Sequence, residues 1–149
     1  MKSLIIYSSA SATKNTREIG RHIHQAMGNI DMNVDFLSIR EFGDLERISE
    51  YDIVVVGTYS WGNGKIPRQM RPLADYFEQH PNKNLVTGVF GSGDSFYPRF
   101  CGAVDQFKAL LSNTTNLAVT LKVELYPQDE DIAKVSKFAE LIKKRYMTA

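Results

Sequence analysis

Three short and nearly continuous apolar runs constrain the fold of this chain most strongly, and they are Leu4 to Tyr7, Ile53 to Val56 and Leu85 to Phe90. Such runs, without polar alternation, are typical of strands that are covered on both faces. Val34 to Leu37 is shorter and mixed, and residues 117–125 alternate apolar with smaller or polar side chains, which is typical of strands with one covered face. The sequence therefore predicts three interior strands and two edge strands.

Apolar stripes at helical spacing lie between the predicted strands. They consist of Ile19, Ile23, Ala26 and Met27 in the first helix, Phe100, Val104, Phe107 and Leu111 in a later helix, and Ile132, Val135, Ala139 and Ile142 in the last. Asn15 and Glu18 predict a capping box at the start of the first helix. Another helix should begin near Pro72, because Pro67 and Pro72 are too close together for both to lie in a first turn. Between residues 41 and 51 we expect only one irregular turn.

Strands that alternate with helices indicate a parallel sheet with right-handed crossovers. With the second and fifth strands as edges, the strand order is 2-1-3-4-5. The expected fold class is therefore α/β, a three-layer fold with a five-stranded parallel sheet and helices on both faces. A chain of 149 residues fits one domain, so we expect residues 1–149 to form a single domain.

Composition excludes several classes of function. The chain has 18 basic and 17 acidic residues, so bulk charge favours neither nucleic acid nor a strongly basic partner. No apolar run approaches the ~18 residues of a membrane span, and the short apolar start lacks the features of a signal peptide. The single cysteine agrees with a reducing compartment. We expect a cytoplasmic monomer that binds neither nucleic acid nor a membrane.

A loop rich in small and hydroxyl side chains follows the first strand and leads into the first helix. Backbone N–H groups, hydroxyls and the positive end of a helix dipole together suit a phosphate group. An ordinary capped connection explains such a loop equally well. The loop lacks the glycines of a Walker loop and of a dinucleotide fingerprint. The candidate phosphate-binding residues are Ser9, Ala10, Ser11, Ala12, Thr13, Lys14, Asn15 and Thr16.

Two further loops follow interior strands, and each carries a large aromatic side chain close to glycines. Trp61 and Tyr97 lie outside the apolar periodicity, which favours a ligand contact over a core position. Since both loops follow strands of one parallel sheet, we expect these two side chains to hold a planar ring between them. The candidate residues are Thr58, Tyr59, Ser60, Trp61, Gly62, Asn63 and Gly64 in the first loop and Ser92, Gly93, Asp94, Tyr97, Phe100 and Cys101 in the second.

Residues 58–64 and 90–105 resemble the two flavin-ring loops of flavodoxins, in the same order along the chain. The resemblance covers essentially the whole chain, and the uninterrupted last strand is similar to that of short-chain members. It implies a flavodoxin-like fold and a bound FMN in the crevice at the carboxyl ends of strands one and three. Flavodoxins themselves exemplify this strand order, so the order adds no independent support.

The resemblance also implies roles for individual residues. Trp61 would cover one face of the flavin ring and Tyr97 would stack on the other, while backbone around residues 92–94 would contact the pyrimidine edge. Gly62 would present the peptide that turns over when the flavin takes its first electron, and glycine suits that change because it has no Cβ. Cys101 would pack near the flavin.

The hydroxyl-rich loop departs from the family pattern of Ser/Thr-x-Thr-Gly-Asn-Thr. Asn15 and Thr16 match the end of that pattern, but the loop before them is longer and has no glycine. Lys14 is also unusual, because the family generally holds the phosphate without a cationic side chain. Two registers stay open, in which the phosphate-binding hydroxyls belong either to Ser9, Ser11 and Thr13 or to Asn15 and Thr16.

The charges near the ring loops also differ from those of the family, whose members are usually acidic. Asn63 stands where an aspartate is common, and the cations Lys65, Arg68, Arg71 and Arg99 lie nearby in sequence. A less negative rim favours the fully reduced flavin, which is an anion. We therefore expect that form to be reached more easily here than in acidic flavodoxins.

The resemblance implies an electron-transfer protein rather than an enzyme, cycling FMN through its semiquinone. Its expected donor is a flavodoxin or ferredoxin reductase, and its acceptor is an unidentified redox protein. The closest alternative is a flavodoxin-like activating protein of the ribonucleotide reductase system, which the near-neutral charge favours and Trp61 opposes. A phosphoacceptor signalling domain needs acids after strand one, where Ser8 and Ser9 stand, and an aspartate after strand three, where Gly57 and Thr58 stand. A quinone reductase needs insertions for which this chain has little room.

Two other features carry no predicted chemistry. Cys101 has no histidine placed to activate it, so a packing role is expected rather than a nucleophilic one. His22 and His24 face different ways on a helix and His80 stands alone, so the sequence predicts no metal site.

Overall fold

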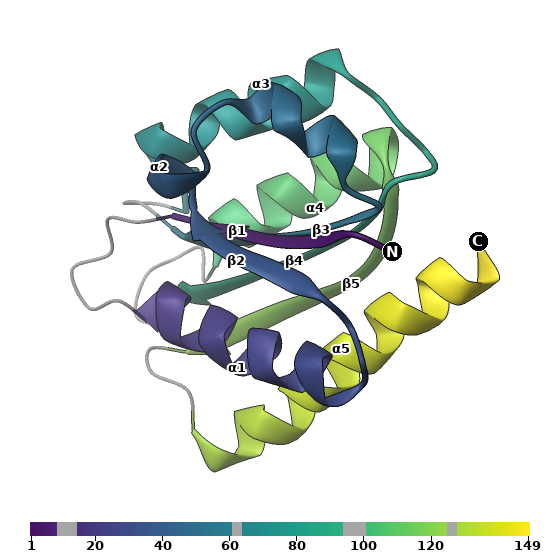
Figure 1. Cartoon of the computed structure of the whole chain (residues 1–149). Coiled ribbons are helices and arrows are strands. Elements are labelled where there is room, and N and C mark those ends of the chain that lie inside the picture. The colour runs from purple at the N-terminus through teal and green to yellow at the C-terminus, as the bar shows by residue number, and fades with distance from the viewer. Residues whose placement is uncertain (9–14, 61–63, 94–100, 125–127) are drawn as a thin grey trace.

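The computed structural model describes residues 1–8, 15–60, 64–93, 101–124 and 128–149 of the chain. Within these residues, five parallel strands form one sheet in the order β2-β1-β3-β4-β5. Figure 1 shows helices on both faces of that sheet. The predicted α/β class, the strand order and the two edge strands are therefore confirmed.

The strands are β1 (Ser3–Tyr7), β2 (Val34–Ser38), β3 (Ile53–Tyr59), β4 (Val86–Gly93) and β5 (Asn116–Glu124). Both β3 and β4 extend beyond the apolar runs that predicted them. Their small polar ends still pair, with Thr58 opposite Gly91 and Tyr59 opposite Ser92. Backbone hydrogen bonding, which does not depend on side-chain polarity, therefore carries the sheet into the two loops of interest.

The helices are α1 (Asn15–Asn29), α2 (Ile39–Phe42), α3 (Arg71–Gln79), α4 (Gly102–Thr114) and α5 (Asp129–Thr148), with 3-10 segments at Leu45–Glu50 and Arg68–Met70. Pro72 lies in the first turn of α3, as predicted. The single irregular turn expected between residues 41 and 51 is wrong, because this region holds part of α2 and a 3-10 helix. A capping box starts α2, in which the Glu41 N–H donates to Ser38 Oγ at 3.1 Å and the Ser38 N–H donates to Glu41 Oε1 at 3.0 Å.

The capping box predicted at Asn15 is also wrong, because Asn15 is the first residue of α1 and not the residue before it. The carboxylate of Glu18 accepts a hydrogen bond from Arg21 Nε at 3.1 Å. This bond holds the pKa of Glu18 below its usual value. Sequence spacing alone does not distinguish an i,i+3 ion pair from a capping box, since both place an acid in the first turn.

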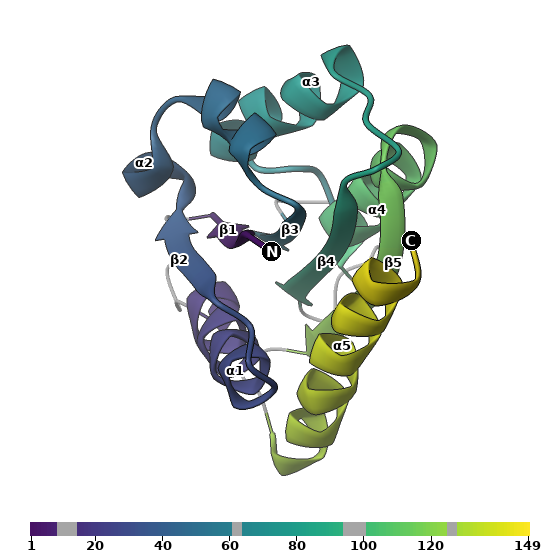
Figure 2. The same ribbon diagram turned by 45° about the vertical axis from the view of Figure 1, so that its right-hand side comes forward.

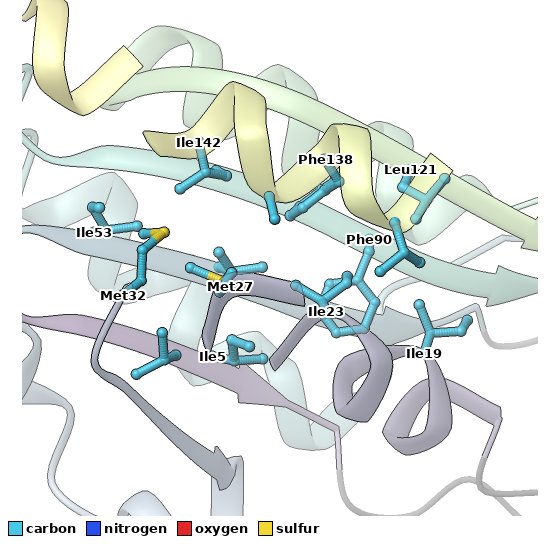
Figure 3. Close-up of a cluster of buried hydrophobic side chains, with 14 of the residues drawn as sticks. Ile5, Ile19, Ile23, Met27, Met32, Ile53, Phe90, Leu121, Phe138 and Ile142 are labelled. Carbon is cyan, nitrogen blue, oxygen red and sulfur yellow. The ribbon is translucent and has the colours of Figure 1, made fainter. Parts of the chain in front are cut away.

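Two apolar clusters cover the two faces of the sheet. Figure 2 shows α1 and α5 on one side of the sheet and α3 on the other. In the first cluster, Ile23 of α1 and Phe138 and Ile142 of α5 pack over β3 and β4 (Figure 3). The second cluster is formed by side chains of α3 and α4 over the opposite face, namely Leu73, Phe77, Val104, Phe107 and Leu111 with Leu4, Ile6, Val54, Val56 and Val89 of the strands.

Among the described members of the predicted stripes, Ile132 does not reach the core. The side chain of Ile132 in α5 is 48% exposed, whereas Phe138, which the stripe omitted, is buried. Asp131 takes the inward position in the first turn, where its Oδ2 accepts a hydrogen bond from the Gln128 N–H at 2.8 Å. Capping at the start of α5 therefore turns Ile132 outward. No helix among the described residues is both long and apolar enough to cross a membrane.

Candidate cofactor site

The carboxyl ends of β1, β3 and β4 meet at one edge of the sheet, where α1 also begins (Figure 1). Ser8 joins the end of β1 to the end of β3. Its N–H donates to the Gly57 carbonyl at 3.0 Å, and its Oγ accepts from the Tyr59 N–H at 3.4 Å. Ser8 is thus anchored to the strand that leads into the first ring loop.

The first turn of α1 is joined to the end of β4 by a contact between two side-chain hydroxyls. Thr16 Oγ1 lies 3.0 Å from Ser92 Oγ, and both side chains are buried. The first four N–H groups of a helix have no partner inside the helix, and the helix dipole makes this end positive. The arrangement places donors and partial positive charge at the edge where the strands end.

Ser60 and Gly64, which follow β3 on either side of residues 61–63, are held against the start of α4. Gln106 Nε2 donates to the Gly64 carbonyl at 2.8 Å, and the Ala103 N–H donates to Ser60 Oγ at 3.0 Å. A Cβ atom on Gly102 would lie 2.6 Å from the Gly64 oxygen, so only glycine permits this approach of the two backbones. Gly64 itself has a φ of 85°, in the left-handed region that favours glycine.

Cys101 lies at the junction between the second ring loop and α4. It has a φ of 52° and precedes the helix, and its side chain is 1% exposed with Sγ 3.8 Å from the Gly91 carbonyl oxygen. A Cβ on Gly93 would lie 2.9 Å from the Cys101 sulfur. Burial raises the pKa of the Cys101 thiol to about 12. The thiol is therefore neutral at ordinary pH, which agrees with packing rather than nucleophilic chemistry.

The other described candidates differ in exposure. The hydroxyl of Thr58 is turned inward and donates to the Tyr59 carbonyl at 2.8 Å, while Tyr59 and Ser60 are half-buried. The remaining candidates lie outside the described residues, so the expected stacking of Trp61 and Tyr97 stays a prediction. These candidates are Ser9, Ala10, Ser11, Ala12, Thr13, Lys14, Trp61, Gly62, Asn63, Asp94, Tyr97 and Phe100.

Several residues that support this edge were missed by sequence reasoning. Ser8, Gly102, Ala103 and Gln106 hold the loops in place through the contacts described above. The adjacent small residues Gly102 and Ala103 at a helix start were the available signal, because such pairs permit a close approach of backbones. The contact of Gln106 with Gly64 had no signal in the sequence, since it joins residues that are 42 positions apart.

Positive charge lies beside the first ring loop. Lys65, Arg68 and Arg71 are exposed, and within the described part of the chain none of them forms an ion pair. Near α4, by contrast, Lys122 Nζ lies 2.8 Å from Asp105 Oδ1. The described residues contain no group of three or more histidine, cysteine, aspartate or glutamate side chains suited to a metal ion.

Comparison with known proteins gives a consistent family. The sequence model described as Flavodoxin matches residues 5–138. The chain is 36% identical over 141 residues to the protein named "Probable flavodoxin 1" of Bacillus subtilis strain 168, covering 93% of this chain and 87% of that protein. It is 33% identical to a flavodoxin of Maridesulfovibrio salexigens, covering 88% of this chain and 91% of the other.

Solved structures agree with this result. A short-chain flavodoxin associated with a non-canonical PDU bacterial microcompartment superposes with a TM-score of 0.91 at 27% identity, covering 98% of this chain and 99% of that one. The flavodoxin of Bacillus cereus called Flavodoxin 1 gives a TM-score of 0.86 at 31% identity, covering 97% and 98%.

The chain belongs to the flavodoxin family and is of the short-chain type. Flavodoxins bind FMN and carry electrons, and they are not enzymes. The resemblance of the two ring loops is therefore confirmed as a family relationship. The electron-carrier function is favoured over the reductase-activator alternative.

Proposed function

We propose that this protein holds FMN at the carboxyl edge of its sheet and exchanges electrons with an acidic partner protein. The proposal that FMN binds at this edge is carried by three contacts that join neighbouring segments there. Ser8 ties β1 to β3, the Thr16–Ser92 contact ties α1 to β4, and Gly102 lies against Gly64. FMN requires donors for a phosphate and a slot for a flat ring, and both belong to these segments.

In this proposal the phosphate lies at the start of α1 and the ring lies between the loops after β3 and β4. The described residues suit these roles, because the first turn of α1 offers N–H donors, and Gly64 and Gly102 bring two backbones close beside the ring position. The proposed contacts are Ser9, Ala10, Ser11, Ala12, Thr13, Lys14, Asn15 and Thr16 for the phosphate, and Thr58, Tyr59, Ser60, Trp61, Gly62, Asn63, Gly64, Ser92, Gly93, Asp94, Tyr97, Phe100 and Cys101 for the ring.

Bound FMN supplies the redox centre, and the chain supplies binding, orientation and shielding from water. Cys101 packs behind Gly91 and Gly93 as a neutral group, which keeps a negative charge away from the ring. The hydroxyl oxygens of Ser8 and Ser60 accept hydrogen bonds from backbone N–H groups. These two side chains therefore hold the backbone beside the loops in place. No described residue needs to act as a nucleophile or a metal ligand.

An anaerobic reductive titration of the purified protein tests this proposal. Two separate one-electron steps in the visible spectrum are expected, because the family carries electrons singly. Direct bleaching in a single two-electron step would favour the ribonucleotide reductase activator. A protein that takes up no FMN would overturn the proposal altogether.

The finer proposal concerns the partners. A flavodoxin or ferredoxin reductase is proposed as the donor, and the acceptor is proposed to be a redox protein, with the ribonucleotide reductase system as one candidate. The exposed cations Lys65, Arg68 and Arg71 lie within or beside the loop after β3, and no acid lies between residues 53 and 74. A surface of this charge steers partners whose docking face is acidic. A cytoplasmic location is part of the same proposal.

Charge reversal tests this docking surface. The combined variant Lys65→Glu, Arg68→Glu and Arg71→Glu should slow electron transfer from its reductase at least about tenfold at low salt, with the difference shrinking as salt rises. Lys144→Glu in α5 is the control, because it changes an exposed cation near the far end of that helix. If each reversed charge slowed electron transfer equally in the triple variant and in Lys144→Glu, a local docking surface would be contradicted.

A further inference from the structure

The contact between Thr16 and Ser92 is a hydrogen bond whose direction the fold leaves open. The two oxygens lie 3.0 Å apart, the side chains are 0% and 5% exposed, and either hydroxyl can be the donor. Within the described residues neither hydroxyl has a second partner. Each hydroxyl carries one proton and two acceptor lone pairs, so one proton serves the contact and the other is free for another acceptor.

A second pair of the same kind shows what fixes the direction. At the start of β4, Thr87 Oγ1 lies 2.7 Å from Thr115 Oγ1. The Thr115 hydroxyl donates to the Leu111 carbonyl at 2.8 Å. Because the proton of Thr115 is used there, Thr87 must donate to Thr115. A carbonyl of the helix therefore settles the direction in that pair, whereas no described carbonyl does so for Thr16 and Ser92.

We infer that Ser92 is a positioning residue for the FMN phosphate, and that it acts by donating its hydroxyl proton to Thr16. Thr16 is the second residue of α1, where an anion is favoured by the helix dipole. If Thr16 donated to Ser92, its lone pairs would be left to face the phosphate. When Ser92 donates, the proton of Thr16 is free to point at the anion, and the two bonds strengthen each other.

This inference rests on the proposed function, because it assumes that the phosphate lies at the start of α1. It adds that a residue at the end of β4, beside the ring loop, controls how well the phosphate is held. Ser92 would then touch the phosphate only through Thr16. The effect of Ser92 should therefore disappear when the Thr16 hydroxyl is absent.

Riboflavin provides the probe, since it is FMN without the phosphate. The dissociation constants of FMN and riboflavin are measured for the apoprotein by fluorescence quenching. The riboflavin constant divided by the FMN constant is the ratio that reports the phosphate contribution alone. In Ser92→Ala we expect FMN binding to weaken about three- to tenfold more than riboflavin binding, because the proposed ring contact of this residue is made by its backbone, which the substitution keeps. Thr16→Val should lower the ratio about ten- to a hundredfold, because it removes a donor to a charged group.

The double variant Ser92→Ala with Thr16→Val makes the test specific. Its ratio should equal that of Thr16→Val alone, because Ser92 has no other route to the phosphate. Ser92→Cys, with a weak S–H donor in a similar volume, should give a ratio between those of wild type and Ser92→Ala. Thr87→Val is the matched control, since it breaks the other hydroxyl pair and should leave the ratio unchanged.

The outcomes separate the inference from the proposed function. A wild-type protein that binds neither FMN nor riboflavin would overturn the proposed function. A wild-type ratio in Ser92→Ala and Ser92→Cys, or full additivity in the double variant, would overturn the inference while FMN binding stands. If Ser92→Ala does not fold, Ser92→Cys decides, because an unchanged ratio there overturns the inference and a lowered ratio supports it.

Discussion

The two faces of the sheet and its carboxyl edge bury different kinds of side chain. On the faces, Ile5, Ile6, Val55 and Val56 are fully buried under helices. At the carboxyl edge, the buried side chains of Ser8, Thr16, Thr58 and Ser92 carry hydroxyls. Apolar burial contributes stability in proportion to its area, whereas hydroxyls at fixed positions form hydrogen bonds of defined direction. We therefore propose that stability and cofactor binding depend on largely separate residues.

The largest expected effect comes from a face. Phe138→Ala removes a buried ring of α5 whose centroid lies 6.4 Å from that of Phe90. It should lower the free energy of unfolding of the apoprotein by about 3–5 kcal/mol, measured by urea denaturation. The folded variant should bind FMN with nearly wild-type affinity. A loss of FMN affinity of more than about tenfold would break the separation between faces and edge.

The next effect comes from the edge and compares two glycines. In Gly102→Ala the new Cβ would meet the Gly64 oxygen at 2.6 Å and its Cα at 2.7 Å, so backbone must move. We expect FMN affinity to fall at least about tenfold and stability to fall by about 1–3 kcal/mol.

Gly28→Ala is its control, because nothing lies within 4 Å of the new Cβ in α1. This variant should gain about 0.5–1 kcal/mol of stability, from the lower helix propensity of glycine, and should keep its FMN affinity. Both quantities come from thermal unfolding and flavin titration. Equal FMN affinities in the two variants would show that the Gly64–Gly102 contact does not shape the ring site.

A smaller effect is the pH dependence of stability that comes from the Cys101 thiol. Cys101 is buried like the residues of the sheet faces but lies beside the ring loops. Burial raises the pKa of its thiol from 9.0 to about 12. Above pH 9 the unfolded chain loses this proton while the folded protein keeps it, so stability falls as pH rises between about 9 and 12. Between pH 8 and 10, wild type should lose about 1 kcal/mol of unfolding free energy relative to Cys101→Ala. A constant difference over that range would show that the thiol is not shielded.

The smallest effect concerns charge at the rim of the edge. Asn63→Asp adds a negative charge within the first ring loop, and a unit charge about 10 Å from the flavin would contribute about 0.4–1.7 kcal/mol between dielectric constants of 80 and 20. The midpoint potential for the second electron should therefore become more negative by about 20–70 mV. Asn84→Asp at the opposite end of β4 is the control and should leave this potential unchanged. An unchanged potential in Asn63→Asp would contradict charge tuning.

Predictions from apolar runs were confirmed, whereas predictions that depended on helix capping were wrong. The apolar runs at Ile53 and Leu85 predicted interior strands, because complete coverage of both faces leaves a local pattern. The exposure of Ile132 was not predictable from its stripe, because Asp131 competes for the inward position through a cap. The segment around residues 41–51 contains more helix than predicted, and the Ser38–Glu41 capping box is a local sequence signal for the start of α2.

The candidate site divides in the same way. The family resemblance of residues 58–64 and 90–105 predicts the ring loops from the sequence, because glycines and aromatic residues at those spacings are specific. The sequence left open which hydroxyls serve the phosphate, since a loop of small polar residues has no periodicity. Thr16 is the described candidate on which our proposal for the phosphate rests, and its hydroxyl is joined to the end of β4.

The sequence by itself determined the alternation of strands and helices, the interior and edge strands, and the family. These properties follow from periodicity and local motifs, which each segment carries on its own. Only the tertiary structure decided that Ser92 meets Thr16 across 76 residues and that Gly102 lies against Gly64. Such contacts depend on how the helices pack against the twisted sheet. The energy of that packing is shared among many side chains, so the sequence around the two contacting residues does not predict their contact.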